Sequence, residues 1–237
     1  MHGEDFAYSD QGLELKGYVV RPEKVSGKRP AVLIAHAWDG RGEAMLEEAR
    51  LIASLGYFGF ALDNYGGAKV GKDKSENEAM MMPLVKDRAM LRRRLLAGFD
   101  AVRKIDGVDP DKIAIEGFCF GGLCAIDLAR SGAEIKGAVS FHGLLMPAEG
   151  VSKENIKAKI LVLHGHDDPM VPPDQVQKFQ EEMTAAKADW QMHIYGNTMH
   201  AFMNKNANDP GFGTVYNETT ARRARRSAND FFADIFA

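Results

Sequence analysis

The sequence predicts an α/β protein with a mostly parallel central sheet and helices on both faces. Short apolar segments of strand length alternate along the chain with longer segments whose apolar residues recur at helical spacing. This alternation is typical of βαβ units, whose right-handed crossovers place helices over both faces of a parallel sheet. With 237 residues and 45% hydrophobic content, the chain can bury a substantial core, and we expect a single domain over residues 1–237.

The expected elements follow from periodicity and from the turn residues between them. After a short polar start, a hairpin is expected around residues 13–20. Strands are expected where short apolar runs end in turn residues, at 31–35, 57–62, 113–116, 136–141, 160–164 and 191–195. Helices are expected where apolar residues recur every three or four positions, at 44–54, 84–104, 123–131, 174–186 and 218–235.

The segment 64–83 has weak periodicity and follows the carboxyl end of a predicted strand. It contains several glycines and three consecutive methionines, which suit adaptable apolar contact. We interpret it either as a mobile cap over a site or as an ordinary surface connection.

Composition and charge exclude several classes of function. A formal net charge of -3 and a pI of about 6.2 provide no basic face for nucleic acid. The basic clusters at 92–94 and 222–226 are interpreted as solvated helix faces rather than phosphate-binding patches. No apolar run reaches the roughly 18 residues that a membrane span needs. The first residues lack the pattern of a secretory signal, so we expect a cytoplasmic protein with no membrane partner.

Neither a metal nor a cofactor is expected. The two cysteines are five positions apart, and no two histidines occupy i, i+4 positions on a predicted helix, so the usual metal-ligand spacings are missing. The glycine-rich turn at 117–122 lacks the spacing of a dinucleotide-binding loop and an acidic ribose partner about 20 residues later. A reducing compartment suits a free catalytic thiol.

The turn Gly-Phe-Cys-Phe-Gly-Gly at 117–122 lies between a predicted strand and a predicted helix. Glycines at 117 and 121 allow the two elements to meet at a sharp angle, and such a turn displays the side chain at its apex. This pattern is that of a nucleophile elbow, which makes Cys119 a candidate nucleophile. The alternative is a glycine-rich turn with an ordinary buried cysteine.

Two later segments place an acid and a base just past strands. The predicted strand 160–164 runs into a turn with two aspartates, and the strand 191–195 runs into a loop that carries His200. Asp168 is preferred to Asp167 as the acid because prolines fix the turn directly after it. Nucleophile, acid and histidine then occur in the order expected of the α/β-hydrolase fold, at strand ends where parallel sheets bind ligands.

An oxyanion hole is expected from two backbone N–H groups. A helix that begins near Phe120 supplies the N–H of that residue and stabilises a thiolate with its dipole. The second donor is expected in the loop 36–40, with Trp38 N–H preferred and Ala37 N–H as the alternative. His36 is expected either to shape this loop by hydrogen bonding or to contact the substrate.

Other histidines compete with His200 for the role of base. His164 and His193 fall within strands and are interpreted as core or face histidines. His142, at a strand end before a glycine, is ambiguous. Cys124 lies on the helix after the elbow and is interpreted as buried.

The segments 117–122, 165–172 and 200–202 together resemble the dienelactone hydrolase family. The resemblance extends from the strand at residue 31 to the tail segment 208–213. It implies an α/β-hydrolase fold and a Cys-Asp-His triad that opens lactones or esters through a thioester. By resemblance the triad roles pass to Cys119, Asp168 and His200.

Two positions depart from the family pattern. Well-studied dienelactone hydrolases carry a glutamate in the loop where Ala37 stands here, and an arginine for the substrate carboxylate where Asn204 stands here. These differences disfavour dienelactone itself as the substrate. Without the glutamate, we expect Cys119 to rest in a conventional partnership with the histidine. The residues expected to contact substrate are His36, Ala37, Phe202 and Asn204.

The expected activity is hydrolysis of lactones or small carboxylic esters through a cysteinyl thioester. Cys119 attacks the carbonyl, the amides of Phe120 and Trp38 bind the oxyanion, and His200, oriented by Asp168, transfers protons. The expected partner is a small-molecule substrate, and the protein is expected to be a monomer or a homodimer. One alternative is a thiol-dependent hydrolase of a thioester or an amide. Another is a non-hydrolytic redox-sensing or binding protein on the same scaffold.

Overall fold

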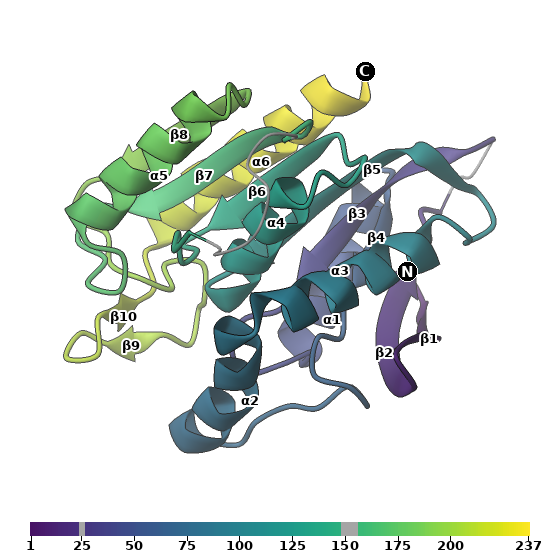
Figure 1. The fold of residues 1–237 in the computed structure, drawn as a ribbon, viewed down its shortest axis with the longest axis horizontal. Helices are drawn as coiled ribbons and strands as arrows, with labels where there is room; N and C mark the ends of the chain where they lie inside the picture. Colours follow the sequence, from purple (N-terminus) through teal and green to yellow (C-terminus); the bar gives the residue numbers. More distant parts are fainter. Residues whose placement is uncertain (24–26, 148–155) are drawn as a thin grey trace. The chain divides into compact units, whose positions relative to one another are not determined.

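A computed structural model describes residues 1–23, 27–147 and 156–237. The central sheet has eight strands, is mostly parallel and has helices around it (Figure 1), which confirms the predicted fold class. Two compact units divide the chain, Met1–Glu116 and Gly117–Ala237. The single domain over residues 1–237 stays a prediction.

The N-terminal unit combines a hairpin with parallel strands. Its elements are β1 (Gly3–Asp10), β2 (Leu13–Val20), β3 (Arg29–Ala35), α1 (Glu43–Ser54), β4 (Phe58–Ala61), α2 (Lys74–Lys86), α3 (Arg88–Val102) and β5 (Val108–Phe118), whose last two residues belong to the next unit. The strands β1 and β2 pair antiparallel, with Gly3 opposite Val20. Strand β4 pairs antiparallel with β2 and parallel with β3, so the hairpin continues a parallel sheet.

Helices α1 and α3 cover opposite faces of this part of the sheet. Helix α1 packs against β2, β3 and β4, and a Cβ atom on Gly59 would lie 2.3 Å from the Ala49 carbonyl oxygen. Helix α3 packs against β1 and β3, and a Cβ atom on Gly98 would lie 2.3 Å from a methyl carbon of Leu62. Positions 59 and 62 point to opposite sides of an extended segment, which accounts for the two covered faces.

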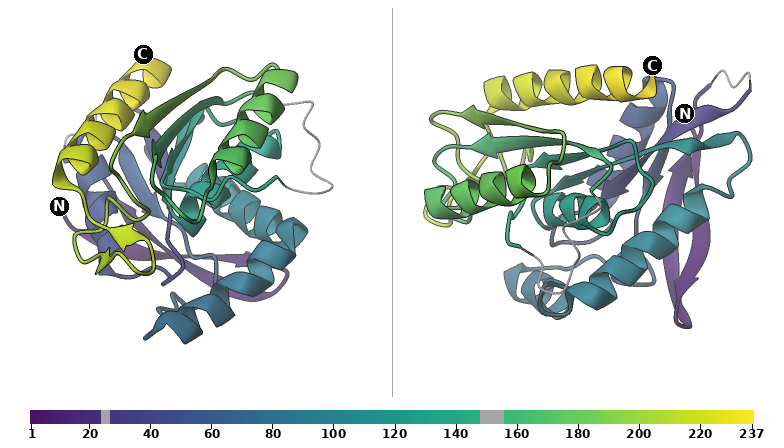
Figure 2. Two further views of the ribbon diagram at one scale, coloured as in Figure 1. Left: turned by 90° about the vertical axis from the view of Figure 1, so that its left-hand side faces the viewer. Right: turned by 45° about the horizontal axis from the view of Figure 1, so that its top comes forward.

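The C-terminal unit is a parallel sheet with helices on both faces. Its elements are α4 (Phe120–Arg130), β6 (Gly137–Phe141), β7 (Lys159–Gly165), α5 (Pro173–Ala185), β8 (Trp190–Tyr195), β9 (Asn208–Asp209), β10 (Thr214–Val215) and α6 (Glu218–Phe236). Strand β7 pairs in parallel with β6 and with β8. Helix α6 covers one face of these strands, and α4 and α5 cover the other (Figure 2).

The expected helix 84–104 is wrong in its extent. Two helices occupy this region, because Asp87 ends α2 and its carboxylate accepts the Met90 N–H at 2.8 Å to begin α3. Helix α2 also occupies part of the segment 64–83, where no helix was expected. The Asp73 carboxylate accepts the Glu76 N–H at 2.9 Å and caps its first turn.

Two arginines of the basic clusters are not the solvated residues that the sequence suggested. Arg94 donates to the Asn64 carbonyl oxygen at 2.6 Å and is half-buried. The Arg225 guanidinium lies 4.7 Å from the centre of the Phe141 ring. Both side chains therefore pack within their own units, and the interpretation of solvated faces fails for them.

Two features are missing from the described part of the chain. None of its helices is both long and apolar enough to cross a membrane. Over the same residues, no group of three or more His, Cys, Asp and Glu side chains is arranged to hold a metal ion.

Candidate active site

Cys119 occupies the sharp turn between β5 and α4, with φ at +54°. Positive φ is rare for a residue with a side chain and persists only where the surroundings impose it. Here the Cys119 N–H donates to the Phe141 carbonyl at 3.1 Å, and the Cys119 carbonyl accepts the Gly122 N–H at 3.0 Å. The elbow expected from the sequence is therefore present, and hydrogen bonds to β6 and α4 hold its backbone.

Glycines allow the close approach that the elbow requires. A Cβ atom on Gly117 would lie 1.9 Å from the Gly121 carbonyl oxygen. A Cβ atom on Gly122 would lie 2.5 Å from the Cα of Gly143, at the corner after β6. Cys119 is half-exposed at this crowded turn, whereas the second cysteine of the chain, at position 124, is buried.

Asp168 and His200 form a buried pair in the same unit. The Nδ1 atom of His200 lies 2.7 Å from a carboxylate oxygen of Asp168, and the two side chains are 1% and 0% exposed. The other carboxylate oxygen accepts the Met170 N–H at 2.8 Å, so the turn itself fixes the acid. Asp167 points elsewhere, is exposed and contacts His166 at 2.8 Å. Because Nδ1 faces the carboxylate, Nε2 of His200 is the nitrogen left for proton transfer.

The tail hairpin β9–β10 anchors the loop that carries the histidine. The His200 N–H donates to the Gly213 carbonyl at 3.0 Å, and the His200 carbonyl accepts the Val215 N–H at 3.0 Å. Gly213 has φ at +82°, and a Cβ atom there would lie 2.1 Å from the Pro169 ring. The acid turn and the histidine loop are thereby packed against one short segment.

Electrostatics couple Cys119 to His200. Burial lowers the pKa of His200, but the charge of the Cys119 thiolate and the hydrogen bond to Asp168 raise it more, to about 10. Within the described residues, Nε2 makes no well-aligned hydrogen bond. The sulfur therefore acts on His200 mainly through its charge, which is its larger effect.

His142 is a neighbour of the pair that sequence reasoning left ambiguous. It has φ at +39°, is buried, and its ring centre lies 5.1 Å from that of His200 and 5.0 Å from that of Phe202. Neither ring nitrogen has a hydrogen-bond partner among the described residues. Burial, followed by the charge of His200, lowers the pKa of His142 well below its usual value, so this ring is neutral. A histidine directly after a strand and before a glycine was the available signal.

The other predicted residues of this unit occupy different settings. Phe120 is the first residue of α4, where backbone N–H groups and the positive end of the helix dipole lie. Phe202 is fully buried, with its ring in contact with those of His142 and Tyr195. Asn204 is exposed, and its side-chain oxygen accepts the N–H of residue 206 at 2.9 Å. Their roles toward a substrate stay predictions.

The predicted residues of the loop 36–40 lie in the N-terminal unit. Ala37 and Trp38 are half-buried, and His36 is fully buried. Both nitrogens of the His36 ring meet backbone groups, the Ala37 carbonyl at 2.6 Å and the Asn64 N–H at 3.2 Å. These contacts favour loop shaping over substrate contact for His36. The oxyanion role of Trp38 stays a prediction.

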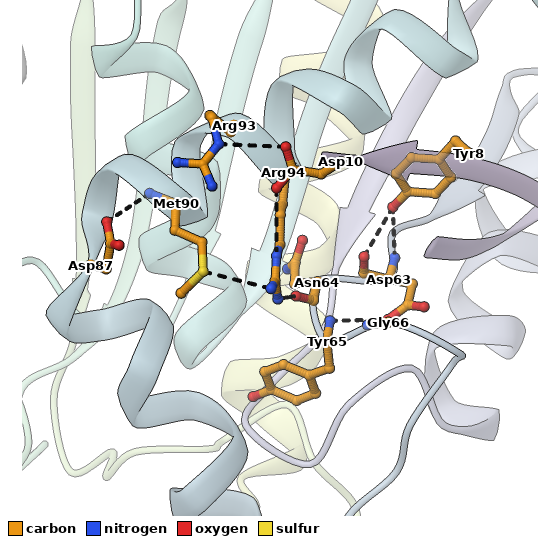
Figure 3. Close-up of polar contacts among 10 residues, drawn as sticks. All are labelled: Tyr8, Asp10, Asp63, Asn64, Tyr65, Gly66, Asp87, Met90, Arg93 and Arg94. Atoms are coloured by element: carbon orange, nitrogen blue, oxygen red, sulfur yellow. Dashed lines mark hydrogen bonds and ion pairs between the residues drawn. The ribbon is translucent and has the colours of Figure 1, made fainter. Parts of the chain in front are cut away.

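A polar network holds the turn after β4, which contacts His36 through the Asn64 N–H. Part of this network is drawn in Figure 3. The Asp63 carboxylate accepts backbone N–H groups at 2.8–3.0 Å from Lys16, Tyr65, Gly66 and Ala68. The Tyr8 hydroxyl donates to the Asp63 carbonyl at 3.1 Å and accepts its N–H at 3.0 Å. Arg94 and Arg93 extend the network by ion pairs with Asp10. Sequence reasoning missed Asp63, whose only signal is an acid directly after a buried strand.

The chain is similar to known proteins over most of its length. A model of the dienelactone hydrolase family matches residues 15–236. The Caenorhabditis elegans protein K02A2.1 is 35% identical over 150 residues, which cover 62% of this chain and 95% of that protein. A protein of Aquifex aeolicus, provisionally named a carboxymethylenebutenolidase, is 28% identical over 235 residues, 97% of each chain.

The fold is shared with a solved structure described as a dienelactone hydrolase-like promiscuous phosphotriesterase from metagenomic libraries. It is 33% identical, with a TM-score of 0.95, and the match covers 100% of this chain and 99% of that one. The family match spans the elbow, the acid turn and the histidine loop. The chain therefore belongs to the dienelactone hydrolase family of hydrolases.

Proposed function

We propose that the chain hydrolyses lactones or small carboxylic esters through a thioester on Cys119. The observation that supports this most is the arrangement of the C-terminal unit. Cys119 lies at an elbow with positive φ, and its charge raises the pKa of the buried His200. His200 is hydrogen-bonded to Asp168 at 2.7 Å. Nucleophile, base and orienting acid are the groups that acyl transfer requires.

In the first half of the reaction, the Cys119 sulfur attacks the acyl carbon and the carbonyl oxygen becomes an oxyanion. The N–H groups of Phe120 and Trp38 are the proposed donors to this oxyanion. The intermediate collapses when the bond to the leaving oxygen breaks, and the proton on Nε2 of His200 passes to that oxygen. A pKa of about 10 means that His200 already carries this proton when the charged sulfur attacks.

In the second half, the sulfur no longer carries a charge because it is part of the thioester. The largest cause that raised the pKa of His200 is then removed, so we expect that pKa to fall. His200 can now accept a proton from water, whose oxygen attacks the thioester carbonyl. The carbon–sulfur bond breaks, the acid product leaves, and the thiolate and the protonated histidine are restored. One residue thus serves as acid and then as base.

The names of relatives define a substrate panel. One relative is provisionally named for a lactone hydrolase, and one solved neighbour is described as a promiscuous phosphotriesterase. Lactones, aryl esters and a phosphotriester therefore belong in one screen, beside a thioester and an anilide for the other acyl classes.

A reducing compartment suits the free thiol, and we keep the cytoplasm as the proposed location.

The test is turnover of this panel by wild type and by Cys119→Ala. Ester or lactone hydrolysis that depends on Cys119 supports the proposal. Preference for the thioester or the anilide would move the activity to another acyl class. Oxidation of Cys119 by peroxide without turnover of any substrate would favour the redox-sensing alternative.

A further inference from the structure

The peptide bond between Ala37 and Trp38 is held from its carbonyl side. The Ala37 carbonyl oxygen lies 2.6 Å from Nδ1 of His36 and accepts the Gly40 N–H at 3.3 Å. In a trans peptide the carbonyl and the N–H point in opposite directions within one plane. Whatever fixes the Ala37 carbonyl therefore fixes the direction of the Trp38 N–H.

The His36 ring can make its two hydrogen bonds in only one form. Nε2 lies 3.2 Å from the backbone N–H of Asn64, which can only donate, so Nε2 carries no proton. The single proton of the neutral ring then sits on Nδ1 and donates to the Ala37 carbonyl. Burial lowers the pKa of His36, which favours this neutral form. Rotation of the ring by half a turn would break both bonds.

The partner of Nε2 is itself fixed. Asn64 follows Asp63, whose carboxylate binds four backbone N–H groups and shapes the turn after β4. The Asn64 carbonyl accepts a hydrogen bond from Arg94 at 2.6 Å (Figure 3). The chain of contacts from Asp63 through Asn64 and His36 to Ala37 lies within one compact unit. Its last member is a backbone peptide rather than a charged group.

A second contact holds the next peptide and provides an internal control. The Tyr65 hydroxyl donates to the Trp38 carbonyl at 2.9 Å. That carbonyl shares its peptide with the N–H of Asp39, not with that of Trp38. The Tyr65 ring also packs on His36, with ring centres 4.6 Å apart. Tyr65→Phe would remove the hydroxyl bond and keep the ring contact.

We propose that His36 is a positioning residue that fixes the direction of the Trp38 N–H, the second proposed oxyanion donor, before substrate binds. This inference rests on the proposed acyl transfer. An oxyanion donor stabilises the transition state more than the bound ester, so its loss lowers kcat more than it raises KM. Attack of Cys119 on iodoacetamide forms no oxyanion and depends only on the thiolate and its access.

The experiment compares His36→Leu, His36→Gln and Tyr65→Phe with wild type. For each protein, kcat and KM for p-nitrophenyl acetate, the alkylation rate of Cys119 by iodoacetamide and the thermal unfolding temperature are measured. We expect His36→Leu to lose roughly 10- to 100-fold in kcat. Its KM and alkylation rate should stay within about twofold of wild type. His36→Gln, whose amide can donate and accept, should recover most of the loss, and Tyr65→Phe should lose less than His36→Leu.

Three results would overturn the inference. One is a His36→Leu enzyme with wild-type kcat, and a second is an equal loss of kcat and of alkylation rate, which would indicate a general distortion. The third is a larger loss in Tyr65→Phe, which would assign the donor to Asp39. If His36→Leu does not unfold cooperatively, the comparison of His36→Gln with Tyr65→Phe decides. Absence of any Cys119-dependent turnover in wild type would overturn the proposed function, and this inference with it.

Discussion

The pKa values of two buried histidines, His200 and His36, are shifted in opposite directions, and their partners explain the difference. His200 faces a carboxylate and a thiolate, which raise its pKa to about 10 against the effect of burial. His36 faces two backbone groups and is dominated by burial, which lowers its pKa. Burial alone therefore does not make a histidine catalytic. Charged partners suit it to proton transfer, and neutral partners suit it to holding a peptide in place.

We expect the largest effect from a change in Asp168, the charged partner of His200. Asp168→Asn would replace the acceptor of the Nδ1 proton with an amide, and the tautomer of His200 would no longer be fixed. We expect kcat for an aryl ester to fall about 10³- to 10⁴-fold. Asp167→Asn is the matched control, since this exposed neighbour contacts His166 instead. Equal losses in both variants would contradict the assignment of the acid.

The pH dependence of the reaction tests the raised pKa of His200. His200 loses its acid form as pH rises through about 10, so the acylation burst should fall as pH rises through that value. The other imidazoles near it, His142 and His164, have lowered pKa values and carry no charge there. An NMR titration of His200 should show the same inflection. Its movement toward the ordinary value in Cys119→Ala would identify the thiolate as the cause, and an inflection near 6.5 in wild type would exclude this coupling.

The buried Arg130 is expected to contribute to the stability of the fold and not to the reaction. Arg130 is 1% exposed and donates to both carboxylate oxygens of Glu182, at 3.0 and 2.7 Å, and to Asp127 at 3.1 Å. Arg130→Met would leave two buried acids without their cation, and we expect a loss of about 3–5 kcal/mol in the free energy of unfolding. Chemical denaturation measures this loss. Turnover per folded molecule should be unchanged, and a fall in kcat without a loss of stability would contradict a purely structural role.

The smallest expected effect concerns the neutral ring beside the base. His142→Phe keeps the edge-to-face contact with His200, so kcat should stay within about threefold of wild type. His142→Ala removes the ring that packs against His200 and should lower kcat by roughly tenfold, because His200 is then less well held in position. Steady-state rates on one aryl ester suffice. If His142→Phe is as slow as His142→Ala, the ring nitrogens take part in the reaction.

The sequence predicted the fold class from its repeating elements, and its motifs named the candidate site residues Cys119, Asp168 and His200. The elbow at Cys119 has a glycine signature, and acid and histidine follow strands in a diagnostic order. Helix α2 was missed because its apolar residues follow one another in a run instead of recurring at helical spacing, and Pro83 lies within it. Its cap, Asp73 followed three residues later by Glu76, was a signal that periodicity alone does not use.

The contacts of His36 and Asp63 could not be predicted for a different reason. Their partners are backbone N–H and carbonyl groups, which every residue has, so no residue type in the sequence marks them. The same holds for His142, whose position beside His200 depends on packing between distant segments. Motifs therefore suggest candidate reactive side chains, whereas the groups that contact those side chains become visible only in three dimensions.

Rapid-quench mass spectrometry with p-nitrophenyl acetate shows whether Cys119 carries an acyl group during turnover. We predict a transient gain of one acetyl group on the peptide that contains Cys119, at a rate that matches the burst of nitrophenol. His200→Ala should abolish this gain. Turnover of the ester with no acetyl group on Cys119, or with the group on another residue, would exclude a thioester on Cys119 as the intermediate.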